Sequence, residues 1–245
     1  MTKVINFAHR GASGVCPENT MAAFRKALEL GATGIETDVQ MTRDGRLVLI
    51  HDELLKRTTG TAGLIKDYSF EEIQNLDAGS WFGEPFGGER IPALEELLDL
   101  TKDLDTIINI ELKNGAVQYP GLEEKVIATV RSYGMEDRVV ISSFNHYSLV
   151  QCKAIAPEIR TGILYMEGLY KAWEYARTVS ADALHAYKLA VLPEWVEEAR
   201  NAGIAYHPFT VNDPGEMKRL IHAKVAGIIT DYPDVLNSLL QDEGA

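Results

Sequence analysis

Residues suited to acid–base and anion chemistry gather near the start of this 245-residue chain. His9 and His51 each follow a short apolar run, and Arg10 follows the first of them. An imidazole takes up or releases a proton near neutral pH, so two histidines can serve one reaction as acid and base. A guanidinium offers a planar fork of N–H donors that fits phosphate oxygens. These residue types predict a site that binds an anion and moves protons.

Three carboxylates accompany them. Glu36 and Asp38 are two positions apart in one apolar run, and Glu111 and Lys113 are two apart in another. Residues two apart on a strand point to the same face. Acids on adjacent strand ends can form an all-oxygen site for a hard cation such as Mg²⁺ or Ca²⁺, with a phosphate completing its coordination. Lys113 would add positive charge for that phosphate.

Each residue also has an ordinary structural explanation. A lone histidine at a strand end is usually a hydrogen-bonding residue, and Arg10 could simply tie down the chain. Glu111 and Lys113 could be a plain ion pair. Taken singly, each of these explanations is favoured. Taken together they are not, because clustered carboxylates repel one another and a fold built for stability alone would avoid them.

The pattern of apolar runs predicts the elements that position these residues. Strands are expected at 4–8, 34–40, 106–112, 138–143, 161–165, 183–186, 204–209 and 227–230. Helices are expected at 20–30, 92–100, 122–133, 146–155, 168–178, 193–202, 214–223 and 233–240. Eight strand–helix units in about 250 residues are typical of an α/β fold of the (β/α)8 TIM-barrel type. The active site of such a barrel lies at the C-terminal ends of its strands.

One departure from this alternation follows the second strand. Arg43-Asp44-Gly45 is a hairpin turn signal, and residues 47–50 are predicted to return antiparallel to that strand. The return would place His51 roughly opposite Glu36 and Asp38. Residues from about 52 to 90 have mixed character and are predicted to form an inserted segment that caps the barrel. No low-complexity linker divides the chain, so residues 1–245 are expected to form one domain.

Composition limits the partners. The formal net charge of −12 argues against binding to nucleic acid or to an acidic membrane. No apolar run approaches a membrane span and no secretion signal is evident, so stable membrane insertion is not expected. Cys16 and Cys152 are far apart and are expected to be reduced thiols of a cytoplasmic protein. A small molecule is therefore the expected substrate, and the oligomeric state stays open.

Four motifs carry a resemblance to a known family. H-R-G-A-S-G-V-C-P-E-N-T (9–20), E-T-D-V (36–39), V-L-I-H-D (48–52) and I-E-L-K (110–113) occur in this order. The chain thereby resembles the glycerophosphodiester phosphodiesterase family, and S-S-F (142–144), F-T-V-N (209–212) and I-T-D-Y-P (229–233) extend the likeness. The resemblance implies a TIM barrel of the phospholipase-C-like phosphodiesterase type, with a small insertion after its second strand.

The resemblance also implies a reaction and a role for each site residue. The reaction is hydrolysis of glycerophosphodiesters, such as glycerophosphocholine and glycerophosphoethanolamine, to sn-glycerol 3-phosphate and an alcohol. Glu36, Asp38 and Glu111 would bind one divalent cation, Ca²⁺ or Mg²⁺; His9 and His51 would be the catalytic acid and base; Arg10, Lys113, Phe144 and Phe209 would bind substrate. The family commonly has Trp where this chain has Phe209.

Other functions remain open from the sequence. A relative that cleaves lysophospholipids or phosphoinositides would need an apolar entrance, to which Trp81, Phe82 and Phe86 could contribute. A barrel that only binds a ligand, or a metal-dependent aldolase or isomerase, could use the same fold. The other histidines are expected to be structural, with His185 the one most able to reach the pocket. The preferred head group, the cation and the division of roles between His9 and His51 are not decided.

Overall fold

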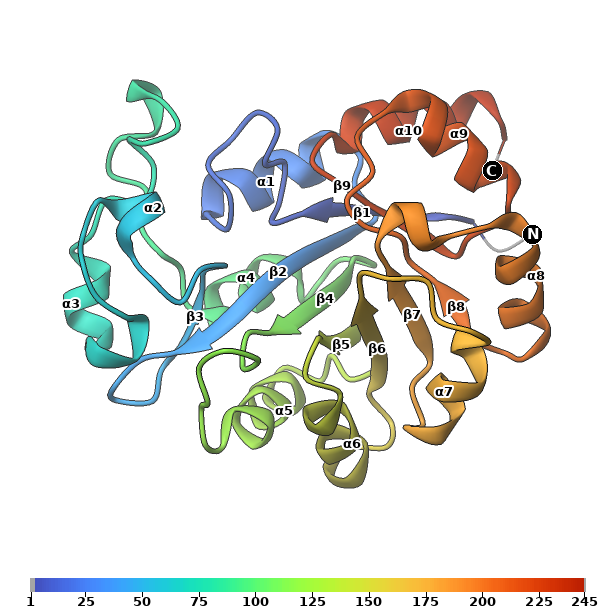
Figure 1. The fold of residues 1–245 in the computed structure, drawn as a ribbon. Coiled ribbons are helices and arrows are strands. Elements are labelled where there is room, and N and C mark those ends of the chain that lie inside the picture. Colours follow the sequence, from blue (N-terminus) through green and yellow to red (C-terminus); the bar gives the residue numbers. More distant parts are fainter. Residues whose placement is uncertain (1–2, 245) are drawn as a thin grey trace.

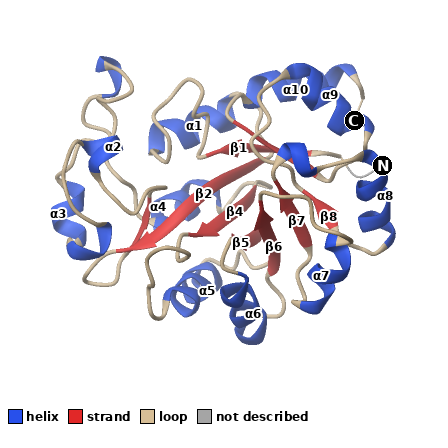
Figure 2. Cartoon of the chain, viewed as in Figure 1, coloured by secondary structure: helices blue, strands red, loops and turns tan. Residues whose placement is uncertain are grey.

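Eight parallel strands form a nearly closed barrel in the computed structural model, which describes residues 3–244 (Figures 1 and 2). In chain order they are β1 (Ile5–His9), β2 (Gly34–Met41), β4 (Ile107–Leu112), β5 (Val139–Ser143), β6 (Arg160–Tyr165), β7 (Ala183–Ala186), β8 (Ala205–Tyr206) and β9 (Gly227–Thr230). Around the barrel the order is β8-β7-β6-β5-β4-β2-β1-β9. The predicted (β/α)8 barrel is confirmed.

The seam of the barrel lies between β8 and β9. Backbone bonds cross it from Ala226 N–H to the Tyr206 carbonyl (3.0 Å) and from Ile229 N–H to the Pro208 carbonyl (3.0 Å). The predicted strand at 204–209 is reduced to β8, two residues long. Pro208 explains the difference, since proline has no N–H to donate to a strand ladder.

Helices surround the barrel (Figure 2). They are α1 (Met21–Glu29), α4 (Leu94–Thr101), α5 (Leu122–Ser132), α6 (His146–Ile155), α7 (Ala172–Thr178), α8 (Pro193–Asn201), α9 (Pro214–His222) and α10 (Pro233–Asp242). Thr20 and Asp213 cap α1 and α9 through their side chains, which accept hydrogen bonds from the backbone N–H of Ala23 and of Glu216. The expected start of α7 at 168 is wrong, because Lys171 has a left-handed backbone (φ +52°) that a helix cannot contain.

The inserted segment, residues 52–90, lies to one side of the barrel (Figure 1). It contains α2 (Lys56–Thr59), a 3₁₀ turn η1 (Ile65–Asp67), α3 (Phe70–Gln74) and a second turn η2 (Glu84–Phe86). It is reached through β3 (Leu47–Leu49), which pairs antiparallel with β2 as predicted.

This segment and the residues directly before and after it share a small apolar core. The core is separate from the larger one of the barrel and consists of Val48, Ile50, Leu55, Ile65, Ile73, Ala78 and Ile91. Its residues are nearly inaccessible to water, so the backbone that leaves β3 is held in place rather than loose. Whether barrel and inserted segment act as one domain stays a prediction. None of the helices within residues 3–244 is both long and apolar enough to cross a membrane.

Candidate active site

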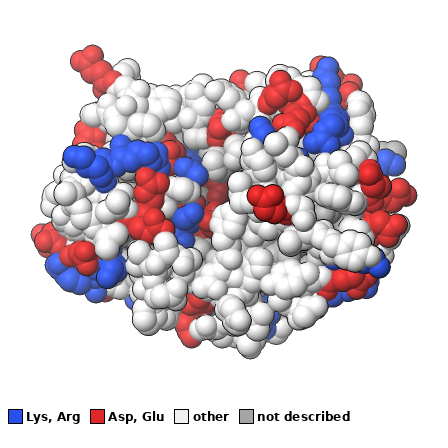
Figure 3. All heavy atoms as spheres, viewed as in Figure 1, with Lys and Arg blue, Asp and Glu red and all other residues white. Residues whose placement is uncertain are grey.

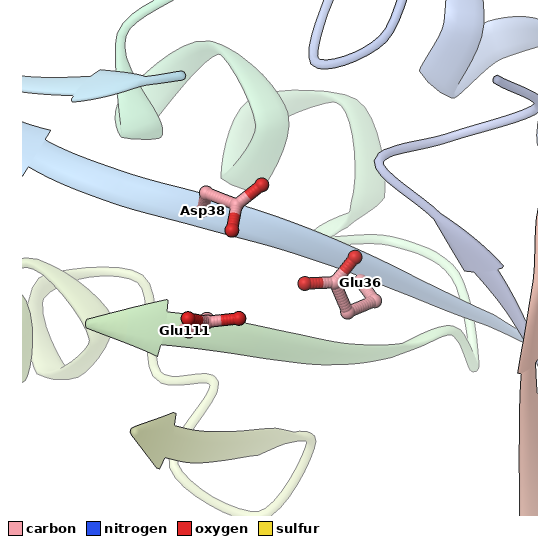
Figure 4. A group of neighbouring side chains, drawn as sticks. All are labelled: Glu36, Asp38 and Glu111. Atoms are coloured by element: carbon pink, nitrogen blue, oxygen red, sulfur yellow. The ribbon is translucent and has the colours of Figure 1, made fainter. Parts of the chain in front are cut away.

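Three buried acids meet on two neighbouring strands, at the level where β1 and β4 end (Figure 4). Glu36 and Asp38 come from β2 and Glu111 from β4, and the strand register pairs Asp38 with Glu111. Each residue offers a side-chain oxygen that lies within 4.8 Å of those of the other two. The residues are 3%, 1% and 9% exposed, in that order. The sequence rule of alternating strand faces therefore brings these acids together.

Their charges are only partly compensated. Burial and the neighbouring charges of Asp38 and Glu111 raise the pKa of Glu36 well above its usual range. Burial and the charge of Asp38 raise the pKa of Glu111 to about 7. Burial would also raise the pKa of Asp38, but the charges of Arg10, His51 and Lys113 lower it instead. The cluster thus holds more negative charge than its surroundings stabilise.

The donor set fits a hard divalent cation. Oδ1 of Asp38 is buried and accepts no hydrogen bond from residues 3–244. A buried carboxylate oxygen is costly unless it is paired or bound to a metal. Three carboxylates with oxygens this close form the all-oxygen arrangement that Mg²⁺ and Ca²⁺ prefer. The cluster could therefore hold such an ion.

A tight turn after β1 places Arg10 above these acids. Arg10 has a left-handed backbone (φ +55°) and Gly11 follows at φ +81°. A Cβ on Gly11 would lie 2.7 Å from the carbonyl carbon of Ala23, so only glycine fits there. The turn directs the Arg10 amide N–H to Glu36 Oε2 (2.9 Å), and its Nε lies 3.3 Å from Asp38 Oδ2. Arginine backbone and side chain both face the cluster.

Lys113 also contacts the cluster. Its Nζ is 2.8 Å from Glu111 Oε1, 3.9 Å from Asp38 Oδ1 and 3.2 Å from His51 Nε2. The ordinary ion pair with Glu111 is therefore present, but it lies inside the site rather than apart from it. Because an ammonium has only protons to offer, Nε2 of His51 accepts in this contact.

Both histidines are oriented by a carboxylate. Nδ1 of His9 lies 2.6 Å from Asp231 Oδ1, and Nδ1 of His51 lies 2.8 Å from Asp52 Oδ1. An ionised carboxylate only accepts, so each Nδ1 carries the proton and each Nε2 is turned toward the site. Nε2 of His9 is 4.0 Å from Glu36 Oε2. The two rings thus present the same nitrogen to the acidic cluster.

The sequence did not assign these two orienting carboxylates. Asp231 directly follows β9, at the same end of the barrel as the other site residues, and that position was the available signal. It also accepts hydrogen bonds from Ser13 Oγ (2.9 Å) and Asn212 Nδ2 (2.6 Å). Burial would raise its pKa, but the bonds from His9, Asn212 and Ser13 lower the pKa of Asp231 to about 2. It is a carboxylate near neutral pH.

An aromatic wall stands at the ends of the central strands. The Phe144 ring, after β5, meets the Phe209 ring edge to face with centroids 6.1 Å apart. The ring of Tyr187, after β7, also contacts Phe209, with centroids 6.3 Å apart. Phe144 is 45% exposed, so its ring is available to a ligand. The predicted pair of aromatic residues is thus brought together, and Tyr187 joins it.

The remaining histidines have other partners. His185 and His207 contact each other inside the barrel (3.0 Å), and His185 is 0% exposed, so it does not open onto a pocket. His146 lies 2.9 Å from both the Tyr175 hydroxyl and the Leu164 carbonyl oxygen. His222 pairs with Glu243 near the chain end. Cys16 and Cys152 are buried and unpaired within the described chain.

A separate cavity lies away from these site residues. A cavity of about 460 Å³ lies at the other end of the barrel, where α8 and α9 meet β8, and Val4, Arg200, Tyr206 and Lys224 are among the residues that line it. No acid or histidine lines it. Its volume would accommodate a ligand, but it offers no group for acid–base or metal chemistry, so the site at the strand ends is the candidate active site.

Comparison with known proteins points the same way. The model of the glycerophosphoryl diester phosphodiesterase family matches residues 9–235. A glycerophosphodiester phosphodiesterase of Caldanaerobacter subterraneus subsp. tengcongensis is 50% identical over 242 residues, covering 99% of this chain and 100% of the relative. A phosphodiesterase of Oleispira antarctica, solved with the product sn-glycerol-3-phosphate, superposes with a TM-score of 0.85 at 33% identity, covering 96% of each chain. A structure from Silicibacter pomeroyi gives 0.90 at 31% identity, covering 100% of this chain and 95% of the other.

Proposed function

The chain belongs to the glycerophosphoryl diester phosphodiesterase family, and from this premise we propose that it hydrolyses glycerophosphodiesters to sn-glycerol 3-phosphate and an alcohol. The Oleispira relative, which binds the product, supports this substrate class. The proposal rests chiefly on the cluster of three buried acids, which two histidines oriented by carboxylates face. Deacylated phospholipids such as glycerophosphocholine and glycerophosphoethanolamine are the proposed substrates.

Glu36, Asp38 and Glu111 are the proposed ligands of one divalent cation, Mg²⁺ or Ca²⁺. A cation bound there would neutralise phosphate charge and polarise a P–O bond. Arg10 and Lys113 add two positive charges at the same site. These charges would stabilise the negative charge of the phosphate in the transition state better than surrounding water would.

His9 and His51 are the proposed acid and base. Each keeps its Nδ1 on a carboxylate, so Nε2 is the atom that exchanges a proton with substrate. One ring removes the proton of the attacking oxygen, and the other protonates the departing alcohol. The exposed ring of Phe144, which contacts Phe209, would offer an apolar surface to the glycerol carbons.

An enzyme-coupled assay for glycerol 3-phosphate tests this proposal. We expect the protein to release glycerol 3-phosphate from glycerophosphocholine, to lose at least ~10³-fold in rate with a chelator, and to recover when Mg²⁺ or Ca²⁺ is added back, because metal-ion catalysis contributes several kcal/mol. No product in any metal would overturn the proposed function. Full activity in chelator would keep the substrate class and overturn the metal.

A second candidate function, cleavage of lysophospholipids, is favoured by where the exposed apolar side chains lie. Apart from Leu104, Val150 and Tyr175, the large exposed apolar side chains lie in the inserted segment or after the C-terminal ends of the strands. They are Val15, Leu54, Trp81, Phe82, Phe144, Tyr147, Met166, Leu169, Tyr170, Leu189, Leu192 and Tyr232. Figure 3 shows a broad uncharged area over β6 and α6 beside the charged region. An acyl chain leaving the proposed site would meet this surface.

Choline release from lysophosphatidylcholine and from glycerophosphocholine, measured side by side, tests this second candidate. We expect Leu189→Ser to lower the ratio of the two rates by about tenfold, since burying a leucine side chain is worth ~1.5–3 kcal/mol. Leu189 is 71% exposed, so the change should not disturb folding. Leu104→Ser, at the opposite end of the barrel, is the matched control. Equal ratios in both variants, or no choline from the lysolipid, would rule out the acyl-binding surface.

The cellular setting stays a prediction. Buried, unpaired Cys16 and Cys152 support a reducing, cytoplasmic location. The net charge of −12 supports a small-molecule substrate rather than nucleic acid.

A further inference from the structure

One arginine of the inserted segment reaches back to the candidate active site. Arg57, on α2, donates to both oxygens of Glu18, with NH1 2.7 Å from Oε2 and NH2 2.7 Å from Oε1. The same guanidinium donates to Asp52, with Nε 2.6 Å from Oδ2 and NH2 3.1 Å from Oδ1. All three guanidinium nitrogens of Arg57 therefore donate hydrogen bonds, and the one cation is shared by two carboxylates.

Each of these carboxylates holds a residue of the site. Asp52 Oδ1 accepts from Nδ1 of His51 (2.8 Å), and Glu18 Oε1 accepts from NH1 of Arg10 (2.9 Å). Arg57 is thus one carboxylate away from the proposed catalytic histidine and one carboxylate away from the proposed phosphate-binding arginine. The charges alternate along this path from Arg10 through Glu18 and Arg57 to Asp52, which accepts the hydrogen bond from His51.

The electrostatics of the two carboxylates depend on Arg57. Its hydrogen bonds are the largest cause that lowers the pKa of Asp52 to about 2. Burial would raise the pKa of Glu18, but Arg57 and Arg10 together lower it. Without Arg57, Asp52 and Glu18 would be two negative groups with one fewer cation between them, and both would be freer to turn away from the site.

The backbone that carries Arg57 is fixed. Its neighbours Leu55 and Thr58 are 0% and 5% exposed, and Leu55 belongs to the apolar core of the inserted segment. The Arg57 guanidinium also lies 6.0 Å from the centre of the Trp81 ring. The backbone position of Arg57 is therefore set by the inserted segment, and its side chain reaches from there to Glu18 of the barrel.

We propose that Arg57 is a positioning residue, through which the inserted segment fixes the orientation of His51 and Arg10. The proposal rests on the proposed phosphodiesterase function. Direct contact with substrate is the rival role, and it is disfavoured because all three nitrogens of the fork already bond to Glu18 and Asp52.

Arg57→Ala tests the proposal. We expect kcat/KM to fall ~10–100-fold, the range found when the partners that orient active-site ligands are removed. We expect Arg57→Lys to recover only a small part, because an ammonium cannot bridge two carboxylates as a planar fork does. Added methylguanidine should restore activity to Arg57→Ala by refilling the gap between Glu18 and Asp52. Arg43→Ala is the matched control, since Arg43 forms an exposed ion pair with Glu72 and should leave kcat/KM unchanged.

A double-mutant cycle separates positioning from direct contact. If Arg57 acts through Asp52, then Arg57→Ala combined with Asp52→Asn should be little worse than Asp52→Asn alone. Additive losses would overturn the proposal and assign Arg57 to the substrate. Wild-type kcat/KM in Arg57→Ala would overturn it as well. A folded state in each variant is checked by its thermal unfolding midpoint, with Arg57→Gln as the substitute if Arg57→Ala does not fold.

A readout without turnover keeps this test separate from the proposed reaction. The ¹⁵N signals of the His51 ring should show a protonated Nδ1 in the wild type and a mixture of tautomers in Arg57→Ala. If wild-type protein released no glycerol 3-phosphate, the proposed function would fail, and these signals would still decide the role of Arg57. Identical His51 signals in both proteins would overturn it.

Discussion

Glu36→Gln, Asp38→Asn and Glu111→Gln are each expected to lower kcat/KM by ~10³-fold or more while the barrel stays folded. Each change removes one negative charge from a site where three side-chain oxygens lie within 4.8 Å of one another. If these residues share one cation, loss of any ligand weakens both its binding and its effect on the phosphate, which is worth several kcal/mol. Calorimetric titration with Mg²⁺ and Ca²⁺ should show weakened binding in all three variants.

The same substitutions are expected to lower activity but not the stability of the metal-free protein. This difference separates a metal ligand from a residue that only stabilises the fold. Glu36 is the clearest case, because burial and two neighbouring acids make its charge unfavourable. Glutamine keeps the oxygen that accepts the Arg10 amide bond and loses only the charge. We expect the free energy of unfolding of metal-free Glu36→Gln to equal or exceed that of the wild type. Lower stability together with unchanged metal binding would contradict the metal site.

The exposed control for these variants is Glu29→Gln. Glu29 is exposed at the end of α1, where it pairs with Lys26, and it lies before the N-terminal end of β2 rather than at the C-terminal ends of the strands. Surface ion pairs contribute little, so neither activity nor metal binding should change.

The barrel was predictable because its signals are local and repeated. Apolar runs of strand length alternate with amphipathic helices, and caps such as Asp213 mark where helices begin. The same alternation predicts the acidic cluster, since residues two apart on a strand share a face and parallel strands end at one edge. Glu36, Asp38 and Glu111 needed no further information than this to be placed together.

The supporting residues were less accessible to sequence reasoning. Asp231 is separated from His9 by almost the whole chain, and the two meet because β9 pairs with β1 in the barrel. Arg57 lies in an irregular segment without a period, so no spacing rule connects it with Glu18. Side chains of this kind are found only once long-range packing is known, because their partners are chosen by the tertiary fold and not by the local pattern.

Two predicted element boundaries were wrong because of backbone constraints that the apolar pattern does not show. The strand expected at 204–209 stops at Tyr206 because Pro208 cannot donate to a neighbour. The helix expected from residue 168 begins at Ala172, after the left-handed Lys171. In both places the apolar pattern extends over residues whose backbone cannot adopt the predicted element.

His9→Ala and His51→Ala are each expected to lower kcat/KM by ~10²–10⁴-fold, the range for loss of a general acid or base. Both rings have Nδ1 on a carboxylate and Nε2 turned toward the same acidic cluster, so they are placed to act on one phosphate. Residues that act as a unit are not additive, because the step fails once either proton transfer is lost. The double variant should therefore be little worse than the worse single variant.

The pH dependence gives a second test of the same pair. Catalysis needs one ring neutral, to accept a proton, and the other protonated, to donate one. The wild-type kcat/KM should therefore fall on both sides of an optimum, and each single variant should lose one limb of that curve or nearly all activity. His222→Ala is the matched control, because His222 is exposed and pairs with Glu243 away from the site. Losses that add in the double variant, with the bell-shaped curve kept in both single variants, would mean that His9 and His51 serve independent structural roles.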